Sequence, residues 1–435
     1  MAEQMIQHKK GEKVAMQAIP TGYKQTEVGV IPEDWSVESL SQVAQITRGK
    51  FSARPRNDPK FFGGDIPFIQ TGDITRSNGY DVNFSQTINE LGLSVSKLFP
   101  ADSLFFTIAA NIGGVAIAKY PAACPDSLVV IKENGHINKR WLYHILSSKK
   151  EVFESIATSN AQLNINLEKL NPYVLGVPEL EEQTAIANVL SDTDALIAGL
   201  EQLIAKKQAI KTATMQQLLT GRTRLPQFAL RPDGTPKGYK SSEHGQIPED
   251  WEVCELQDAV IFLDGQRRPI KSGERAKMAG GYPYYGASGI VGYVNDYIFD
   301  EDLILLGEDG ENILSRSVPL AFQVSGKIWV NNHAHVLKPQ NDFHIYFLTE
   351  YLESLDYSLF NSGTAQPKLN KKTCQRIKVI KPKYEEQTAI ATILSDMDSE
   401  LTALAQKLAK ARDVKQGMMQ QLLTGRIRLP LEVVA

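Results

Sequence analysis

Two long stretches of the sequence carry apolar residues at helical spacing. In residues 181–210 the apolar positions recur three to a heptad, and residues 390–414 repeat this pattern. Acidic residues lead each stretch and basic residues follow it, an order that the helix dipole favours. Gly221 and Gly425 stand where a C′ glycine ends a helix, with a proline a little beyond each. The pattern predicts two helices of about forty residues, each about 60 Å long.

Short β-rich runs and amphipathic segments occupy the rest of the sequence. Glycine, asparagine and aspartate punctuate the β-rich runs, which fall in two regions. The first region contains GGDIPFIQTGDI, SLFFTIAANIGGVAIAKY and SLVVI; the second contains YPYYGASGIVGYV, YIFDEDLILLGEDG and KIWVNNHAHVL. A segment with helical spacing ends each region, INKRWLYHILSSKKEVFESIA in the first and FHIYFLTEYLESL in the second. Both regions have the same order of elements, which is strands, then a helix, then a long helix. This order predicts an α+β fold.

An internal repeat frames both β-rich regions. Residues 20–40 (PTGYKQTEVGVIPEDWSVESL) recur 216 positions later, and residues 178–226 recur 204 positions later with 28 identities in 49 positions. The last twelve residues of the longer repeat, MQQLLTGRTRLP, differ from their copy at one position. The regions between the repeats have diverged. This arrangement predicts one duplicated frame that carries two different binding domains, here called the first and second inserts.

The repeat also predicts where the domains begin and end. We expect two inserts, residues 41–177 and 257–381, and frame segments at 1–40, 178–226, 227–256 and 382–435. If a pseudo-two-fold axis relates the two halves, as in a homodimer, the long helices must pair antiparallel. The second helix then returns the chain to the vicinity of its N-terminal repeat. A linker joins the first helix to the second copy of the short repeat, whereas the equivalent junction in the other half lies between the two ends of the chain. Circular permutation leaves a break of this kind.

Composition excludes several classes of protein. The sequence is 42% apolar and 22% charged, as in ordinary globular proteins, and no apolar run reaches the length of a membrane span. The N-terminal residues lack the apolar core of a secretory signal. Three cysteines far apart match neither a disulfide framework nor a zinc-ligand spacing. We therefore expect a cytoplasmic protein with no membrane segment.

Basic residues are concentrated in three segments of a chain whose net charge is −3. Residues 48–76 contain six Lys or Arg against three Asp, residues 264–277 contain five against two acids, and residues 368–383 contain seven and no acid. Local basic segments in an acidic chain suit a polyanion that binds at chosen places. Solvated surface charge explains any one segment about as well.

Motifs for covalent chemistry are weak. The NPY at 171–173 lacks the second proline of an amino-methyltransferase motif, and Val130 stands where a nuclease strand between Asp126 and Lys132 needs an acid. The GxxxxGK[ST] phosphate loop is absent. His333 and His335 share one face of a strand, but no third metal ligand is evident, so a structural or base-contacting role is favoured. We expect no catalytic site and no metal site in this chain.

Binding residues are better represented, because basic loops stand at matching points of both inserts. Their Lys and Arg side chains would contact phosphates, and nearby polar residues would contact base edges. Each polar residue alone is more often a turn former, and each tyrosine is as well explained by core packing. In the first insert the candidates are Lys50, Arg54, Arg56, Lys60, Gln70, Thr71, Asp73, Asn111 and Gln162. In the second insert they are Gln266, Arg267, Arg268, Lys271, Tyr284, Tyr285, Asn331, Asn332, His333, Gln366 and Lys368.

The sequence resembles the specificity subunit of type I restriction–modification enzymes along its whole length. The resemblance rests on the two GYK…IPEDW segments, the two EEQTAIA helices, the two MQQLLTGR ends and the stretch YPYYGASGIVGYVNDYIF…GKIWVNNHAHVLKP. It implies that each insert is a target-recognition domain, which contacts one half of a bipartite, asymmetric site in double-stranded DNA. The long helices would set the gap between the half-sites. The chain would be a non-catalytic, DNA-binding subunit.

The resemblance also implies partners. Two DNA methyltransferase subunits would dock on the helices, motor-nuclease subunits would join them, and S-adenosylmethionine, ATP and Mg²⁺ would belong to those partners. Identity of the repeats is what two copies of one methyltransferase require. The residues that we expect to contact partners are Glu182, Gln183, Gln216, Gln217, Glu386, Gln387, Gln420 and Gln421. A non-catalytic coiled-coil scaffold, whose inserts bind other proteins, is the alternative.

Overall fold

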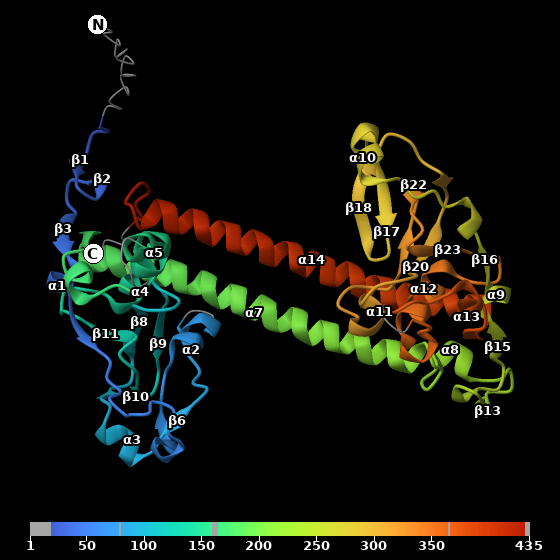
Figure 1. Ribbon diagram of the computed structural model, residues 1–435, viewed down its shortest axis with the longest axis horizontal. Helices are drawn as coiled ribbons and strands as arrows, with labels where there is room; N and C mark the ends of the chain where they lie inside the picture. Colours follow the sequence, from blue (N-terminus) through green and yellow to red (C-terminus); the bar gives the residue numbers. More distant parts are fainter. Residues whose placement is uncertain (1–18, 78–79, 159–163, 364–365, 431–435) are drawn as a thin grey trace, which may run out of the picture. The chain divides into compact units, whose positions relative to one another are not determined.

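A computed structural model describes residues 19–77, 80–158, 164–363 and 366–430. The chain forms two compact units (Figure 1). Unit 1 consists of Met1–Glu201 and Lys407–Ala435, and unit 2 consists of Gln202–Gln406. Each unit therefore contains one insert and a part of both long helices.

The two predicted long helices are confirmed. Helix α7 spans Leu180–Leu218 and helix α14 spans Tyr384–Leu422, so each has 39 residues and a length of about 59 Å. Their ends agree with the sequence prediction, because Gly221 and Gly425 take φ of 70° and 67° shortly after the last helical residue. None of the described helices is long and apolar enough to cross a membrane.

Ion pairs show that α7 and α14 run antiparallel within each unit. In unit 1, Asp194 and Glu201 of α7 pair with Lys415 and Arg412 of α14. In unit 2, Lys207 and Lys211 of α7 pair with Glu400 and Asp398 of α14. Adding the repeat offset of 204 to Asp194 and Lys211 gives Asp398 and Lys415. One Asp–Lys pair is thus present twice with its helices exchanged, once in each unit.

A polar cluster around a buried glutamate fixes the start of one long helix to the end of the other in unit 1. Glu182, in the first turn of α7, accepts a hydrogen bond from Trp35 Nε1 at 3.0 Å. Arg428, just beyond α14, donates to both oxygens of Glu182 and to both oxygens of Asp34. We call these four residues the unit 1 clamp. The hydrogen bond from Arg428 holds the pKa of the Asp34 carboxyl below its ordinary value.

Unit 2 contains the same cluster, here called the unit 2 clamp. Glu386 of α14 accepts from Trp251 Nε1 at 2.9 Å, and Arg224 Nε and Nη2 donate to its two oxygens at 3.0 and 2.6 Å. Arg224 also donates to both oxygens of Asp250. The members of this repeated clamp are therefore residues that the sequence repeats: the second Glu of EEQ, the Arg of RLP and the Asp-Trp of EDW.

The glycine at each helix end is needed for close packing as well as for its backbone. A Cβ on Gly221 would lie 2.5 Å from Cδ of Pro248 and 2.9 Å from the ring of Trp251. A Cβ on Gly425 would lie 2.5 Å from Cδ of Pro32. Each positive φ also favours glycine. Each helix end therefore docks on a Pro-Glu-Asp-Trp segment, here called the PEDW segment. In unit 2 this segment is residues 248–251, which follow the helix along the chain. In unit 1 it is residues 32–35 of the N-terminal repeat.

Short hairpins precede each PEDW segment. The hairpin β1 (Tyr23–Thr26) and β2 (Gly29–Pro32) in unit 1 has its counterpart in β13 (Tyr239–Ser242) and β14 (Gly245–Pro248) in unit 2. A two-stranded pair follows in each unit and leads back to the long helix. These pairs are β3 (Ser36–Ser39) with β12 (Val174–Val177), and β15 (Glu252–Glu255) with β24 (Lys378–Lys381). The frame is thus built twice from the same elements.

Both inserts contain a four-stranded antiparallel sheet with the same strand order. In the first insert the order is β4 (Ala44–Arg48), β11 (Leu128–Glu133), β8 (Ser103–Thr107) and β9 (Val115–Ala118). In the second it is β16 (Val260–Phe262), β23 (Ala334–Pro339), β20 (Leu303–Gly307) and β21 (Ala321–Val324). The two divergent sequences therefore fold onto one sheet topology, and the predicted α+β class is confirmed.

Each sheet packs on helices that also contact the long helices. The main core of unit 1 joins β4, β8 and β11 to α4 (Lys139–Ser148), α5 (Lys150–Thr158) and the ends of α7 and α14. The main core of unit 2 joins β16, β20 and β23 to α12 (Ile345–Glu353) and the long helices in the same way. The two predicted insert helices are confirmed, with a break after Ser148 that the sequence pattern did not indicate.

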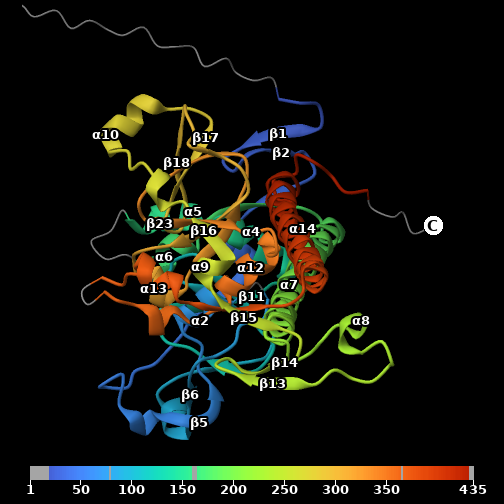
Figure 2. The same ribbon diagram turned by 90° about the vertical axis from the view of Figure 1, so that its right-hand side faces the viewer.

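A second layer of shorter elements differs between the inserts. The first insert adds η1 (Pro59–Phe61), β5 (Phe62–Pro67), α2 (Thr71–Arg76), β6 (Thr87–Ile88), α3 (Glu90–Ser94), β7 (Leu98–Phe99) and β10 (Ala122–Ala123). The second adds η2 (Asp264–Gln266), α10 (Ser272–Arg275), η3 (Ala276–Met278), β17 (Tyr282–Gly286), β18 (Gly289–Val294), β19 (Phe299–Asp300), α11 (Asn312–Ser315) and β22 (Lys327–Val330). In both views the β17–β18 hairpin and α10 stand out from the rest of unit 2 (Figures 1 and 2).

The remaining described elements are single turns at junctions. They are α1 (Leu40–Val43), α6 (Leu167–Leu170), α8 (Pro226–Ala229), α9 (Leu256–Ala259), η4 (Tyr357–Phe360) and α13 (Lys371–Gln375). One strand prediction was wrong, because the QTGDI of the first insert forms the N-cap and first turn of α2. The carboxylate of Asp73 accepts a hydrogen bond from the backbone N of Gln70 at 2.9 Å, which caps the helix.

The clamp generates a stability prediction. We expect Glu386→Ala to destabilise unit 2 by about 3–5 kcal/mol, because the buried Arg224 guanidinium and the Trp251 indole N–H lose their shared acceptor. The matched control is Glu400→Ala on the same helix. It removes a partly exposed pair with Lys207 and should cost less than about 1 kcal/mol. Urea unfolding followed by tryptophan fluorescence compares the two variants, and equal losses would contradict the role of the clamp.

Candidate nucleic-acid interface

The basic segment 48–60 lies at one end of the first insert's sheet. Strand β4 ends at Arg48, whose Nε donates to the backbone O of Asp126 at 2.9 Å, shortly before β11 begins. Arg56 also reaches this point, where its Nη2 lies 2.8 Å from Asp126 Oδ2. The segment therefore folds back across the sheet end and returns its second arginine to the same carboxylate.

Other predicted cations of this segment are exposed. Lys50 and Arg54 have no ion pair in the part of the chain that the structure describes. Lys60 lies 2.9 Å from Asp58 and over the ring of Phe61, with much of its side chain in solvent. Surface pairs of this kind contribute little to stability, so these cations remain available to phosphates.

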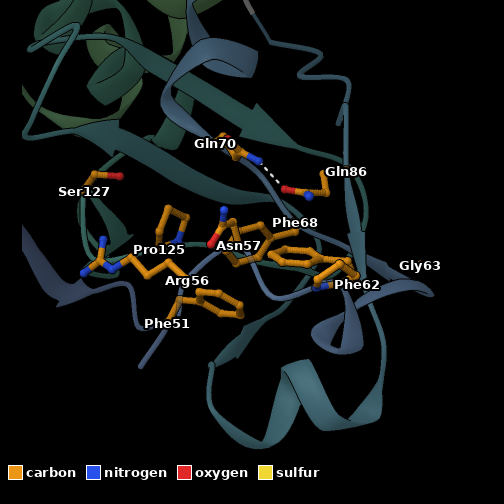
Figure 3. Close-up of a pocket in the computed structure, with 11 residues that line it drawn as sticks. Phe51, Arg56, Asn57, Phe62, Gly63, Phe68, Gln70, Gln86, Pro125 and Ser127 are labelled. Atoms are coloured by element: carbon orange, nitrogen blue, oxygen red, sulfur yellow. Dashed lines mark hydrogen bonds between the residues drawn. The ribbon is translucent and has the colours of Figure 1, made fainter. Parts of the chain in front are cut away.

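A pocket of about 670 Å³ opens beside the basic segment (Figure 3). Three phenylalanine rings, three amide side chains and one guanidinium give it a mixed aromatic and polar wall. Its lining residues are Phe51, Arg56, Asn57, Pro59, Phe62, Gly63, Phe68, Gln70, Gln86, Pro125 and Ser127. Of these, only Arg56 and Gln70 were predicted from the sequence. The cluster of aromatic and basic residues in 48–62 was a signal for the loop, but nothing in the sequence indicated Gln86.

The other predicted residues of the first insert have mixed outcomes. Asp73 is buried, and its carboxylate is taken by Gln70 N and by Arg76 at 2.6 Å, so the structure corrects its assignment as a base-contacting residue. Asn111 is exposed and donates to Thr75 Oγ1 at 2.8 Å. Thr71 begins α2 beside Gln70 and is half-buried. Gln162 lies outside the described residues.

In the second insert, Arg267 lies at the equivalent end of the equivalent sheet. Its Nη1 donates to Glu308 Oε2 and to the backbone O of Ala334, each at 2.7 Å. Glu308 follows β20, Ala334 begins β23, and Arg267 itself follows β16 and η2. The largely buried guanidinium therefore joins three strand ends, so it supports the loops and is less available to DNA than the sequence suggested.

A buried histidine completes this junction. His335 Nδ1 lies 2.8 Å from Asp264 Oδ2, and its Nε2 lies 2.9 Å from the backbone O of Leu369. Both ring nitrogens face acceptors, which only the imidazolium satisfies. Burial alone would lower the pKa of His335, but the hydrogen bonds with Asp264 and Cys374 raise it to about 10. His335 is thus a structural cation that holds the η2 loop and the segment at 369 against β23.

Surrounding this junction are the polar residues that the sequence selected. His333 is exposed and pairs with Asp309 at 2.8 Å. Lys368 is exposed, with its Nζ 3.5 Å from Glu308 Oε1. Asn331 is nearly buried, because its Oδ1 accepts from the backbone N of His333 at 2.7 Å, so its amide oxygen is occupied. The remaining predicted residues at this edge, Gln266, Asn332 and Gln366, are exposed.

The β17–β18 layer holds the last predicted residues of the second insert. Arg268 and Lys271 are exposed between η2 and α10. Tyr284 is buried, and its hydroxyl accepts from the backbone N of Ile270 at 3.1 Å. Its assignment to DNA contact is therefore corrected to core packing. Tyr285 is half-buried, and its backbone O accepts from Asn331 N at 3.1 Å, so it joins this layer to the four-stranded sheet.

Half of the residues predicted to contact partners are internal. Glu182 and Glu386 belong to the clamps, and both are buried. Gln183 is also buried, and donates to the backbone O of Pro178 at 2.9 Å and of His136 at 3.0 Å. Gln387 repeats this arrangement with Pro382 and Asp342. The structure corrects these four assignments, because the EEQ motif joins the long helix to the frame and the insert. Gln216, Gln217 and Gln420 are exposed and Gln421 is half-buried.

The same four positions of the duplicated helices line a groove in each unit. The groove of unit 1 has a volume of about 380 Å³ and that of unit 2 about 680 Å³. The α14 positions in unit 1 are Arg412, Lys415, Gln416 and Met419, and the α7 positions in unit 2 are Gln208, Lys211, Thr212 and Met215, which stand 204 residues earlier. An aspartate of the other helix and a tyrosine of the insert complete each groove: Asp194 with Tyr143, and Asp398 with Tyr346.

Metal binding has no support in the described part of the chain. There, no group of three or more His, Cys, Asp or Glu side chains is arranged to hold a metal ion. His333 and His335 belong to separate ion pairs, with Asp309 and Asp264. The arrangement at both sheet ends suits recognition of an anion by exposed cations beside exposed amides.

Comparisons with known proteins agree with this architecture. A family model described as the type I restriction modification DNA specificity domain matches residues 32–211 and 248–411. The proposed type I restriction enzyme MjaX specificity subunit of Methanocaldococcus jannaschii is 28% identical over 430 residues, covering 94% of this chain and 97% of that protein. The type I restriction enzyme EcoprrI specificity subunit of Escherichia coli is 23% identical, covering 83% of this chain and 86% of that protein.

Solved structures show the same fold. A crystal structure of the type I restriction–modification system S subunit from M. genitalium aligns with a TM-score of 0.60, covering 89% of this chain and 96% of that chain at 18% identity. A chain from a structural study of complex assembly and conformational transition in a type I R-M system aligns with a TM-score of 0.52, covering 91% of this chain and 99% of that chain at 14% identity.

The buried imidazolium generates a pH prediction. Because the folded-state pKa of His335 lies near 10 and the unfolded value near 6.5, its stabilisation is complete below about pH 6.5 and is lost as pH rises toward 10. We expect His335→Gln to lower the free energy of unfolding by a few kcal/mol, of the order of 3, at pH 6 and by much less at pH 9.5. Urea unfolding at the two pH values measures this. The exposed His333→Gln is the control, and a His335→Gln deficit that does not shrink with pH would refute the assignment.

Proposed function

The chain belongs to the family of type I restriction–modification DNA specificity subunits, and on that premise we propose that each insert binds one half of a bipartite DNA site. The first insert would contact one half-site and the second insert the other. Because the two insert sequences differ, the half-sites would differ too, and the complete site would be asymmetric. The chain itself would contribute binding and no covalent chemistry.

One observation carries this proposal. Two inserts with divergent sequences fold onto the same four-stranded sheet, and both place exposed cations beside exposed amides at the same end of that sheet. Phosphate contacts by cations position a protein on DNA, and amides can form paired hydrogen bonds with base edges. The repeated frame holds both domains by the same contacts, whereas the exposed loops are free to differ.

The long helices would set the distance between half-sites. Within each unit α7 and α14 pack antiparallel, and their repeated Asp–Lys pairs fix the register of one helix on the other. Helices tied together in this way resist sliding, because a shift would separate buried and half-buried charges. The gap between half-sites would therefore be a property of helix length, while the bases recognised would be a property of the inserts.

We propose that two methyltransferase subunits dock on the duplicated grooves. Each groove presents the same helical positions, and the exposed glutamines of MQQLLTGR lie on the same helices. Two copies of one partner need two similar surfaces, and the grooves share a lysine and a methionine, Lys415 and Met419 in unit 1 and Lys211 and Met215 in unit 2. S-adenosylmethionine, ATP and Mg²⁺ would be bound by the methyltransferase and motor-nuclease subunits of the complex.

Exposed arginines provide a direct test of DNA binding. We expect Arg54→Ala and Arg268→Ala each to weaken binding and to reduce the slope of log K against log salt by about 0.9 per lost phosphate contact. Arg222→Ala, an exposed arginine at the end of α7, is the control and should leave both quantities unchanged. Fluorescence anisotropy across a salt series measures them. Unchanged affinity at low salt for both insert variants would remove these loops from the interface.

Helix length provides a test of the spacer. One heptad is inserted after Gln202 in α7 and another after Gln406 in α14, midway between the two repeated Asp–Lys pairs. Each helix grows by about 10 Å, so we expect the gap in the methylated site to grow by about three base pairs while both half-sites stay the same. Sequencing of methylated sites in cells that carry the complete system measures this. Altered half-sites with an unchanged gap would refute the role of the helices.

A further inference from the structure

We propose that the aromatic and amide pocket of the first insert binds a single nucleobase that has left the base stack of the DNA. This proposal rests on the proposed function, because it assigns one subsite within the half-site bound by the first insert. The wall of the pocket comes from the basic segment 48–60 and from the elements that follow it, β5 and the start of α2. The pocket therefore lies among the residues that would contact the DNA backbone.

Aromatic rings form one side of the pocket. The rings of Phe51 and Phe68 lie with centroids 5.0 Å apart, and Phe62 lies 5.6 Å from Phe51 and 6.3 Å from Phe68. Phe51 and Phe68 are buried, and Phe62 is half-buried. Because these rings are held by one another, they form a preorganised apolar wall. A planar heterocycle is the ligand class that such a wall binds without regard to base identity.

A pair of amides forms the opposite side. Gln70 Nε2 donates to Gln86 Oε1, as the dashed line in Figure 3 marks. Gln86 Nε2 has no hydrogen-bond partner among the described residues, and the Gln70 side chain also accepts from the backbone N of Asp73 in the capping box of α2. Because an amide oxygen has two lone pairs, Gln70 Oε1 still offers one acceptor to a ligand, and Gln86 Nε2 offers a donor. The Watson–Crick edge of every nucleobase carries both donors and acceptors, so a base edge can form hydrogen bonds with these two amides.

The remaining features of the pocket fit a nucleotide better than an apolar molecule. Arg56 stands at the pocket with its side chain half in solvent, and Asn57 beside it is exposed and has no hydrogen bond within the described chain. A guanidinium at the mouth suits the phosphate of an extruded nucleotide. The volume of about 670 Å³ leaves space for a base together with its sugar. An apolar ligand would leave both amides unused.

Extrusion has a physical cost that the pocket can offset. Unstacking a base costs a few kcal/mol, and aromatic stacking with hydrogen bonds to the base edge recovers an amount of similar size. The cost of unstacking would make binding selective for DNA sequence, because a base pair that opens easily is favoured at that position of the half-site. The equivalent edge of the second insert is filled by the Arg267, Glu308 and His335 junction, so extrusion would be confined to the first half-site.

The test uses the full chain and a duplex that contains its methylated site, in which each base of the half-site is replaced in turn by a fluorescent analogue. These analogues, 2-aminopurine and pyrrolocytosine, brighten when they leave the stack. We expect a several-fold rise in fluorescence at one position, or at that position and its neighbour. The double variant Gln70→Leu and Gln86→Leu, and separately Ser127→Phe, which fills the pocket, should abolish the rise and weaken binding about tenfold.

Controls separate this inference from the function on which it rests. Gln45→Leu makes the same chemical change on exposed β4, away from the pocket, and should keep both the signal and the affinity. Binding without a fluorescence rise at any position would overturn the base-binding pocket and leave DNA recognition standing. A rise that persists in Gln70→Leu/Gln86→Leu and in Ser127→Phe would also overturn it. Absence of DNA binding by the full chain would overturn both proposals.

Discussion

Each of the two units depends on the same interaction of a buried glutamate. A glutamate at the start of each long helix accepts hydrogen bonds from a tryptophan indole and from an arginine that follows the other long helix. A buried carboxylate is tolerated only when its charge is matched and its lone pairs are used. The clamp meets both conditions, so it fixes the antiparallel order of the helices. It also brings a PEDW segment onto each helix end.

Because the clamp and its supporting glutamine hold the frame alike in both units, variation is concentrated in the inserts. Their four-stranded sheets keep one topology, while the layers added to them differ. In the first insert the sheet end opens into an aromatic and amide pocket. In the second, the equivalent end is closed by a junction of Arg267, Glu308 and a buried imidazolium. The inserts thus share a scaffold and differ in what they offer to a ligand.

Sequence patterns predicted the frame well because its information is local or repeated. The period of apolar residues gave both 39-residue helices, and constant offsets gave their antiparallel relation. Burial of charge was not predictable in the same way. Glu182 looks like a surface residue of an acidic helix start, and only contacts with Trp35 and Arg428, 147 and 246 positions away, place it inside. The pocket was not predicted from the sequence for the same reason, because only the contact with Gln70 shows that Gln86 belongs to it.

We propose that each insert specifies one half-site independently of the other, on a frame that the chain builds twice. Exchange within the chain tests this most directly: residues 257–381 are replaced by a second copy of residues 41–177, and methylated sites are sequenced in cells that carry the complete system. Two equal domains on a two-fold frame should recognise an inverted repeat, built from one original half-site and separated by the original gap. A methylated site that stays asymmetric, or whose two halves repeat in the same direction, would contradict the account.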